Sequence, residues 1–198
     1  MTTYSFPAIT FEIEGDPEAV RETGRTHGRF ATVAGEAAAD LRTLNSGAWA
    51  GSEGDLFRAR VTEIPPHLET AHRAFAQVSR SLDGFAEVLA AAQRQMAGVR
   101  ADAEQTHRSL SCARADRAGL RQPIGDGPAD PAAQNAYQEQ RHALEARFGE
   151  LEAAWSDQLA AAAGLRDRVL EAARHSGAAV RAAGRTSPTA DQGWLADQ

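Results

Sequence analysis

The chain has 198 residues, of which 42% are hydrophobic and only 6% aromatic, and its formal net charge at pH 7 is −6. Acidic residues and arginines are interleaved, so the sequence offers no basic patch for nucleic acid. No apolar run approaches the roughly 18–20 residues that cross a bilayer. The N-terminus lacks the basic and apolar segments of a conventional cleavable export signal. The single cysteine, Cys112, excludes an intrachain disulfide framework.

Residues 1–15 alternate aromatic and β-branched side chains, which predicts an extended arm with at most one short strand. Asp16 and Pro17 then predict a helix start, since an N-cap side chain is followed by proline at the first helical position. This helix is expected over about residues 17–46. Its apolar or small positions alternate steps of three and four, the period of a seam between packed helices. They are Val20, Thr23, His27, Phe30, Ala34, Ala37, Leu41 and Leu44.

Residues 45–47 (Asn-Ser-Gly) predict the end of this helix, and Trp49-Ala50-Gly51 follows as a turn. A second helix is expected over about residues 53–64. Proline removes an amide donor and clashes with the preceding turn, so Pro65-Pro66 predicts a break or sharp kink there.

A third, long helix is expected over residues 66–118, because its seam positions alternate three and four without a skip. They are Leu68, Ala71, Phe75, Val78, Leu82, Phe85, Leu89, Ala92, Met96, Val99, Ala103, Thr106, Leu110 and Ala113. Three prolines and three glycines in residues 119–131 then predict a loop.

A last helix is expected over residues 132–184. Its seam is less pure, since Arg141 and Gln158 interrupt it, and three glycines weaken it or mark the close approach of a neighbouring backbone. The positions are Tyr137, Arg141, Leu144, Phe148, Leu151, Trp155, Gln158, Ala162, Leu165, Val169, Ala172, Ser176, Ala179 and Ala183, and the glycines are Gly149, Gly164 and Gly177.

These elements predict an all-α fold: an elongated antiparallel helical bundle or coiled-coil hairpin over residues 16–184, with a helix-turn-helix at the Trp-x-Gly turn. Residues 185–198 are expected to form a polar tail or linker. Within that tail, Trp194 and Leu195 are either a docking site for a partner, a segment that packs back on the helices, or the start of a following domain.

The sequence contains no candidate for catalysis. None of the six histidines is spaced to place two metal ligands on one helical face, so neither a metal nor another cofactor is expected. Cys112 lies beside a seam position, where a small apolar filler is the simpler account. There is no nucleophile elbow, P-loop or dinucleotide fingerprint. The chain is therefore expected not to be an enzyme.

With Trp49 and Gly51 between two seam-forming helices, Phe57 six residues after Gly51 and a double proline beyond, residues 15–115 resemble the WXG (Trp-x-Gly) superfamily of type VII, or ESX, secretion substrates. The likeness is greatest to the N-terminal targeting domains of actinobacterial polymorphic toxins. Family members often carry a Tyr-x-x-x-acid export signal. Here Tyr137 is followed four residues on by Arg141, and Tyr4 by Ala8.

The resemblance implies a targeting or adaptor domain that leaves the cytoplasm by a non-Sec route, as the N-terminal part of a secreted toxin. It also implies a small helical WXG-like partner or chaperone, a secretion ATPase, and a homo- or hetero-dimer. The competing interpretation is a structural coiled-coil scaffold or spacer, in which Trp49 only caps the helix pair.

Overall fold

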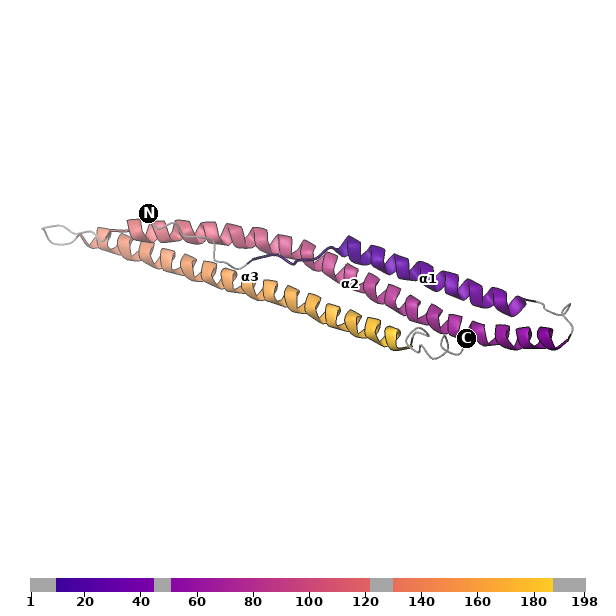
Figure 1. Cartoon of the computed structure of the whole chain (residues 1–198). Helices are drawn as coiled ribbons and strands as arrows, with labels where there is room; N and C mark the ends of the chain where they lie inside the picture. Colours follow the sequence, from indigo (N-terminus) through magenta and orange to yellow (C-terminus); the bar gives the residue numbers. More distant parts are fainter. Residues whose placement is uncertain (1–9, 45–50, 122–129, 187–198) are drawn as a thin grey trace. The chain divides into compact units, whose positions relative to one another are not determined.

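A computed structural model describes residues 10–44, 51–121 and 130–186. Three helices account for nearly all of them, and no strand occurs in these ranges, which confirms the all-α prediction (Figure 1). The helices are α1 (Pro17–Thr43), α2 (Ser52–Gly119) and α3 (Pro131–Thr186). Residues 10–16 run without helix or strand, as expected for an arm; residues 1–9 lie outside the described part.

The start of α1 is the one that Asp16 and Pro17 predict. The Asp16 carboxylate accepts hydrogen bonds from the backbone amides of Glu18 (2.9 Å) and Ala19 (3.1 Å). These amides have no partner within the helix, so the side chain completes the first turn. At the other end, the cap residue Leu44 donates its amide to the carbonyl of Leu41.

The predicted break at Pro65-Pro66 is wrong, because α2 continues through both prolines as one helix of 68 residues. Proline nitrogens cannot donate to the carbonyls of Val61 and Thr62, one turn earlier. Val61 is half-buried and Thr62 exposed, so water can reach these carbonyls. The predicted helices 53–64 and 66–118 are therefore a single element.

The described residues divide into two compact units, to both of which α2 and α3 contribute. The two-helix unit comprises residues 1–13 and 92–167, in which the arm meets parts of α2 and α3. The three-helix unit comprises residues 14–91 and 168–198, in which all three helices take part.

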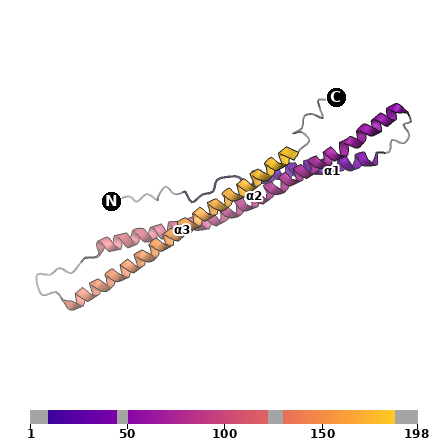
Figure 2. The same ribbon diagram turned by 90° about the horizontal axis from the view of Figure 1, so that it is seen from below.

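In the two-helix unit, α2 and α3 run antiparallel (Figures 1 and 2), as paired contacts at successive levels show. Thr106 accepts a 2.9 Å hydrogen bond from the Gln158 amide, and the Arg114 guanidinium lies over the Phe148 ring. The α2 side chains buried here all belong to the predicted seam: Ala92, Met96, Ala103, Thr106, Leu110 and Ala113.

The seam predicted for α3 is correct at most positions and wrong at Arg141. Ala162, Leu165, Ser176 and Ala183 are buried, whereas Arg141 is exposed and its Nε donates to Glu145 at 2.9 Å. Burying an unpaired guanidinium costs more free energy than packing at the seam provides, so the Arg141 side chain points to solvent. Gln158, the other polar interruption, stays half-buried because Thr106 supplies a partner.

The arm packs onto the two-helix unit through its backbone and one aromatic ring. Phe11 is buried, with its ring edge-on to Trp155 at a centroid distance of 6.0 Å. The Gln93 amide donates to the Ile13 carbonyl at 3.1 Å, and Arg166 donates to a second arm carbonyl, that of Thr10. The arm therefore supplies the apolar and polar contacts that a third helix supplies in the other unit.

In the three-helix unit, α2 lies between α1 and α3 and must bury two faces. Ala183 of α3 packs with Ala74 and Val78 of α2, and the hydroxyls of Ser81 and Ser176 are 3.2 Å apart. The second face meets α1, whose Gly24, Gly28 and Gly35 lie close against it. Ala74 and Ala86 are buried although the single predicted seam omits them.

Candidate interaction surface

The predicted turn between the first two helices is described only from Gly51 onward; Trp49 and Ala50 lie outside the described residues. Gly51 has a φ of +106°, in the region that favours glycine, and its carbonyl accepts a hydrogen bond from the Asp55 amide at 3.1 Å. A Cβ at Gly51 would have no atom within 4 Å. Its backbone conformation, and not crowding, is what makes glycine favourable there.

Phe57, the aromatic residue of the predicted motif, lines a groove of about 350 Å³ between the end of α1 and the start of α2. The Phe57 side chain is 36% exposed. The walls of the groove are mainly apolar: Leu41, Leu44, Phe57, Val61, Pro65 and Pro66. Pro65 is itself buried, so the double proline shapes this groove instead of ending the helix.

The face with which α1 meets α2 consists of small residues that alternate four and three apart. These are Gly24, Gly28, Ala31, Gly35 and Ala38. A Cβ at Gly24 would lie 2.8 Å from the Asp83 carboxylate and 3.3 Å from the Ser79 carbonyl, and one at Gly35 would lie 3.0 Å from the His72 ring. Glycine thus allows the two backbones to approach closely, and His72 donates to the Ala31 carbonyl at 2.7 Å.

Because the small residues take the interface, the large apolar residues of α1 are displaced from it. Phe30 is 56% exposed, Val33 62% and Leu44 52%, although the sequence places Phe30 and Leu44 on the predicted seam. The prediction that Phe30 and Leu44 lie in the buried seam is therefore wrong. Phe30 stays at the edge of the interface, where its ring lies 5.7 Å from that of Phe75. Phe30, Val33 and Leu44 are called the α1 stripe below.

Sequence reasoning missed the face that positions α1, although a signal was present. A four-three alternation of glycine and alanine is as regular as the alternation of larger residues, but hydrophobic periodicity predicts the larger residues as the buried face. Small residues at this spacing favour close helix approach, whereas large ones at the neighbouring positions are left on the surface.

Acidic groups flank the α1 stripe on one side. Glu36 and Asp40 lie three and seven residues after Val33, which places them beside it on the helix surface. Neither carboxylate makes an ion pair with any residue in the described ranges. The nearby Arg42 is paired across the interface with Glu69. The stripe is thus an apolar surface with a negative border.

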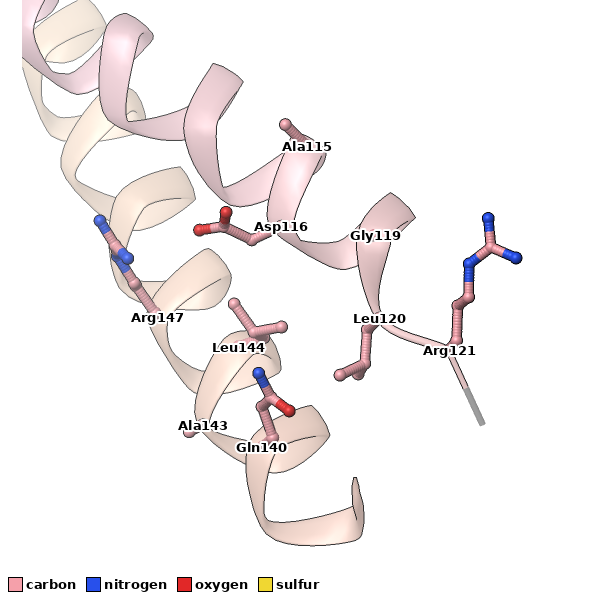
Figure 3. Close-up of a pocket in the computed structure, with 9 residues that line it drawn as sticks. All are labelled: Ala115, Asp116, Gly119, Leu120, Arg121, Gln140, Ala143, Leu144 and Arg147. Atoms are coloured by element: carbon pink, nitrogen blue, oxygen red, sulfur yellow. The ribbon is translucent and has the colours of Figure 1, made fainter. Parts of the chain in front are cut away.

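A second hollow, of about 650 Å³, lies where α2 ends and α3 begins (Figure 3). Asp116, Leu144 and Gln140 point toward the space between the helices, whereas Arg121 points away from α3. Nothing in this arrangement brings a nucleophile together with a base. Cys112 is exposed, three residues before the first lining residue, Ala115, and is not the buried filler that the sequence predicts.

Charged groups on the surface form local pairs that shift the pKa values of their members. The hydrogen bond from Arg141 lowers the pKa of the Glu145 carboxyl, and the same contact raises the pKa of Arg141. Arg100 bridges the Glu104 carboxylate on its own helix and Glu12 of the arm, and the bond to Glu104 is the larger cause of its raised pKa. All these groups are exposed, so the pairs contribute little to stability.

Among the described residues, no three His, Cys, Asp or Glu side chains are placed to hold a metal ion, and no helix is both long and apolar enough to cross a membrane. His27 packs against Phe75 and bonds the Thr23 carbonyl at 2.8 Å, a packing role. Tyr137 is half-buried. The predicted docking residues Trp194 and Leu195 lie outside the described ranges.

A family model described as "Putative T7SS secretion signal domain" matches residues 12–190. The chain belongs to this type VII secretion signal family. The match includes the arm from Glu12 onward, all three helices and the residues between α1 and α2. No curated protein and no solved structure matches the chain.

The resemblance to type VII secretion substrates is confirmed at the level of the secretion signal family. A secretion-targeting role and a type VII route follow from that membership. The helical hairpin bundle of this signal domain also agrees with the fold that the sequence predicts.

Proposed function

We propose that this type VII signal domain acts as an adaptor that presents the α1 stripe to a small helical partner, and that the pair is delivered to the secretion ATPase. Membership of the signal family supports the targeting role. The α1 stripe supports the adaptor role, since the large apolar side chains of Phe30, Val33 and the cap residue Leu44 are exposed along α1 and its end. An amphipathic helix is the natural ligand for such a stripe.

The acidic residues beside the α1 stripe favour a partner helix whose apolar face has basic residues next to it. Glu36 and Asp40 are available for arginine or lysine, and opposite charges at the rim of an interface favour encounter and register. On this proposal Trp49, Gly51 and Phe57 form a WXG-type turn, and the chain is the non-catalytic N-terminal part of a secreted toxin.

The single observation that carries the adaptor role is the exposure of Val33, which is 62% accessible. Val33→Arg should leave the fold intact, because the side chain contributes little buried area, yet it places a cation in the centre of the stripe. We expect binding of the helical partner, and export of a reporter fused after residue 198, to fall about tenfold or more, equivalent to about 1.4 kcal/mol.

The matched control is Gln77→Arg, which adds the same charge at an exposed position of α2 in the same unit. Circular dichroism should show the same helix content for both variants. Unchanged export of Val33→Arg would contradict the adaptor role, and equal losses for both variants would assign the effect to charge alone.

A further inference from the structure

The α2 face that packs on α3 continues beyond the end of α3. Val78 packs with Ala183, and counting back by sevens from Val78 gives Ala71, Ile64 and Phe57. Residues seven apart share one face of a helix packed along a neighbour. Ile64 is 40% exposed and Phe57 36%, while Ala71 is half-buried. Ile64 and Phe57 are called the α2 stripe below.

The helix α3 ends before it reaches the α2 stripe. Ala183 lies level with Ala74 and Val78, and Thr186 is the last residue of α3. Three more helical residues advance α3 by only about 4.5 Å, whereas Ile64 lies about 14 Å further along α2 and Phe57 about 24 Å further. The α2 stripe is thus an apolar continuation of a packed face.

We propose that residues 187–198 of the same chain dock on the α2 stripe through Trp194 and Leu195. Because α3 is antiparallel to α2, its C-terminal end at Thr186 points along α2 toward Ile64. Trp194 is the eighth residue after Thr186, and eight extended residues span up to about 26 Å. Both residues of the stripe are within this reach.

The chemistry of the two segments is complementary. Trp194 and Leu195 are the only large apolar residues in positions 187–198. The groove beside Phe57, about 350 Å³ with apolar walls, has room for a large side chain. The apolar pair in the tail thus matches the apolar walls of the groove.

The docking is tested by cysteine cross-linking in a Cys112→Ser background, which removes the exposed native thiol. One variant carries Glu63→Cys beside the α2 stripe and Ala196→Cys in the tail. The matched control carries Glu171→Cys with Ala196→Cys, since Glu171 is exposed on α3 about 22 Å back from Thr186. A tail without a docking site reaches either partner.

Under mild oxidation we expect the intrachain disulfide to form at least about fivefold faster with Glu63→Cys than with the control, because docking raises the local concentration of the tail thiol. Adding Trp194→Ala should remove the difference. Equal rates in the two pairs would overturn the proposal. Cross-links between chains that increase with protein concentration would overturn it in favour of a second copy.

Hydrogen exchange supplies an independent measurement on the chain without added cysteines. In the Trp194→Ala/Leu195→Ala variant, amides of residues 57–71 should exchange severalfold faster, whereas those of residues 92–113 should not change. The Gln192→Ala variant should match the wild type. Unchanged exchange at residues 57–71 would contradict the docking. Hydrogen exchange tests the docking of the tail, whereas export of the Val33→Arg variant tests the adaptor role. Either proposal can therefore fail without the other.

Discussion

The two-helix unit and the three-helix unit differ in how many large apolar side chains they leave exposed. In the two-helix unit, Met96, Leu110, Leu165 and Phe11 are buried. All eight large hydrophobic residues found exposed among the described ranges lie in the three-helix unit. They are Phe30, Val33, Leu44, Leu56, Phe57, Ile64, Leu170 and Val180.

The difference follows from what fills the space beside α2. In the two-helix unit, the arm contributes Phe11 and two backbone carbonyls, and none of the exposed large hydrophobic residues in the described ranges belongs to this unit. In the three-helix unit, α1 meets α2 through glycine and alanine, so its own large side chains remain outside. A third helix therefore adds exposed apolar surface here, which is why the interaction surface is assigned to this unit.

The largest effect that tests this comparison is expected at Met96, which is 2% exposed. Met96→Ala should lower the free energy of unfolding by about 2–5 kcal/mol, because it leaves a cavity at a fully buried position of α2. Leu170→Ala, at an exposed position of the three-helix unit, should change it by less than about 0.5 kcal/mol. Chemical denaturation measures both. Similar losses would show that the two units do not differ in burial.

A somewhat smaller effect is expected at Phe11 of the arm. Phe11→Ala should destabilise the chain by about 2–3 kcal/mol, at the low end for a buried aromatic residue since the arm can shift to cover Trp155. The fluorescence of Trp155 should change as its edge contact is lost. Thr10→Ala is the control, because the Thr10 contact uses only the backbone carbonyl. If Phe11→Ala changed neither the stability nor the fluorescence of Trp155, the arm would not contribute to the packing of this unit.

The interface of α1 is tested by placing the same side chain at two glycines. Gly24→Leu should destabilise the chain by about 1–3 kcal/mol, since the new side chain meets Asp83 and the Ser79 backbone. Gly84→Leu, in open space on α2, should instead stabilise it by about 0.5–1 kcal/mol through helix propensity. Thermal melts compare the two variants. Equal responses would contradict the close approach of α1 and α2.

The smallest effect is expected from the exposed Arg141–Glu145 pair. The pKa of Glu145 is lowered in the folded chain, so its ionised carboxylate stabilises the fold. This contribution to stability is present above the ordinary carboxyl pKa and is lost as the pH falls through the lowered value. Arg141→Gln should raise the pKa of Glu145 toward its ordinary value in an NMR titration, with no measurable change in Tm at neutral pH. A large drop in Tm would contradict the exposure of this pair.

Local chemistry explains why some elements were predictable and others were not. The start of α1 depends on Asp16 and Pro17 alone, so two adjacent residues determine it. The effect of Pro65-Pro66 depends on whether water or another group satisfies the carbonyls of Val61 and Thr62, and on how Pro65 packs, neither of which a local pattern contains. The docking of the arm is likewise non-local, since Gln93 and Arg166 lie far from Thr10 and Ile13 in the sequence.

The candidate site was predictable in part. The sequence singles out Gly51 and Phe57 by spacing; Gly51 has the positive φ that favours glycine, and Phe57 lines the α1–α2 groove. The exposure of Phe30 and Leu44 was not predictable from hydrophobic periodicity, because large and small residues on α1 follow the same three-four alternation on neighbouring faces. Only the approach of α2 decides which of the two faces is buried.

The sequence by itself determined that the chain is helical, that α2 and α3 pair along a long seam, and that the turn at Gly51 favours glycine. These depend on periodicity, capping and φ, which are properties of short segments. The tertiary structure alone decided that α1 packs through Gly24, Gly28 and Gly35, and that the arm completes the two-helix unit. The physical reason is that close approach of backbones, and the exposure it leaves elsewhere, depends on residues distant in sequence.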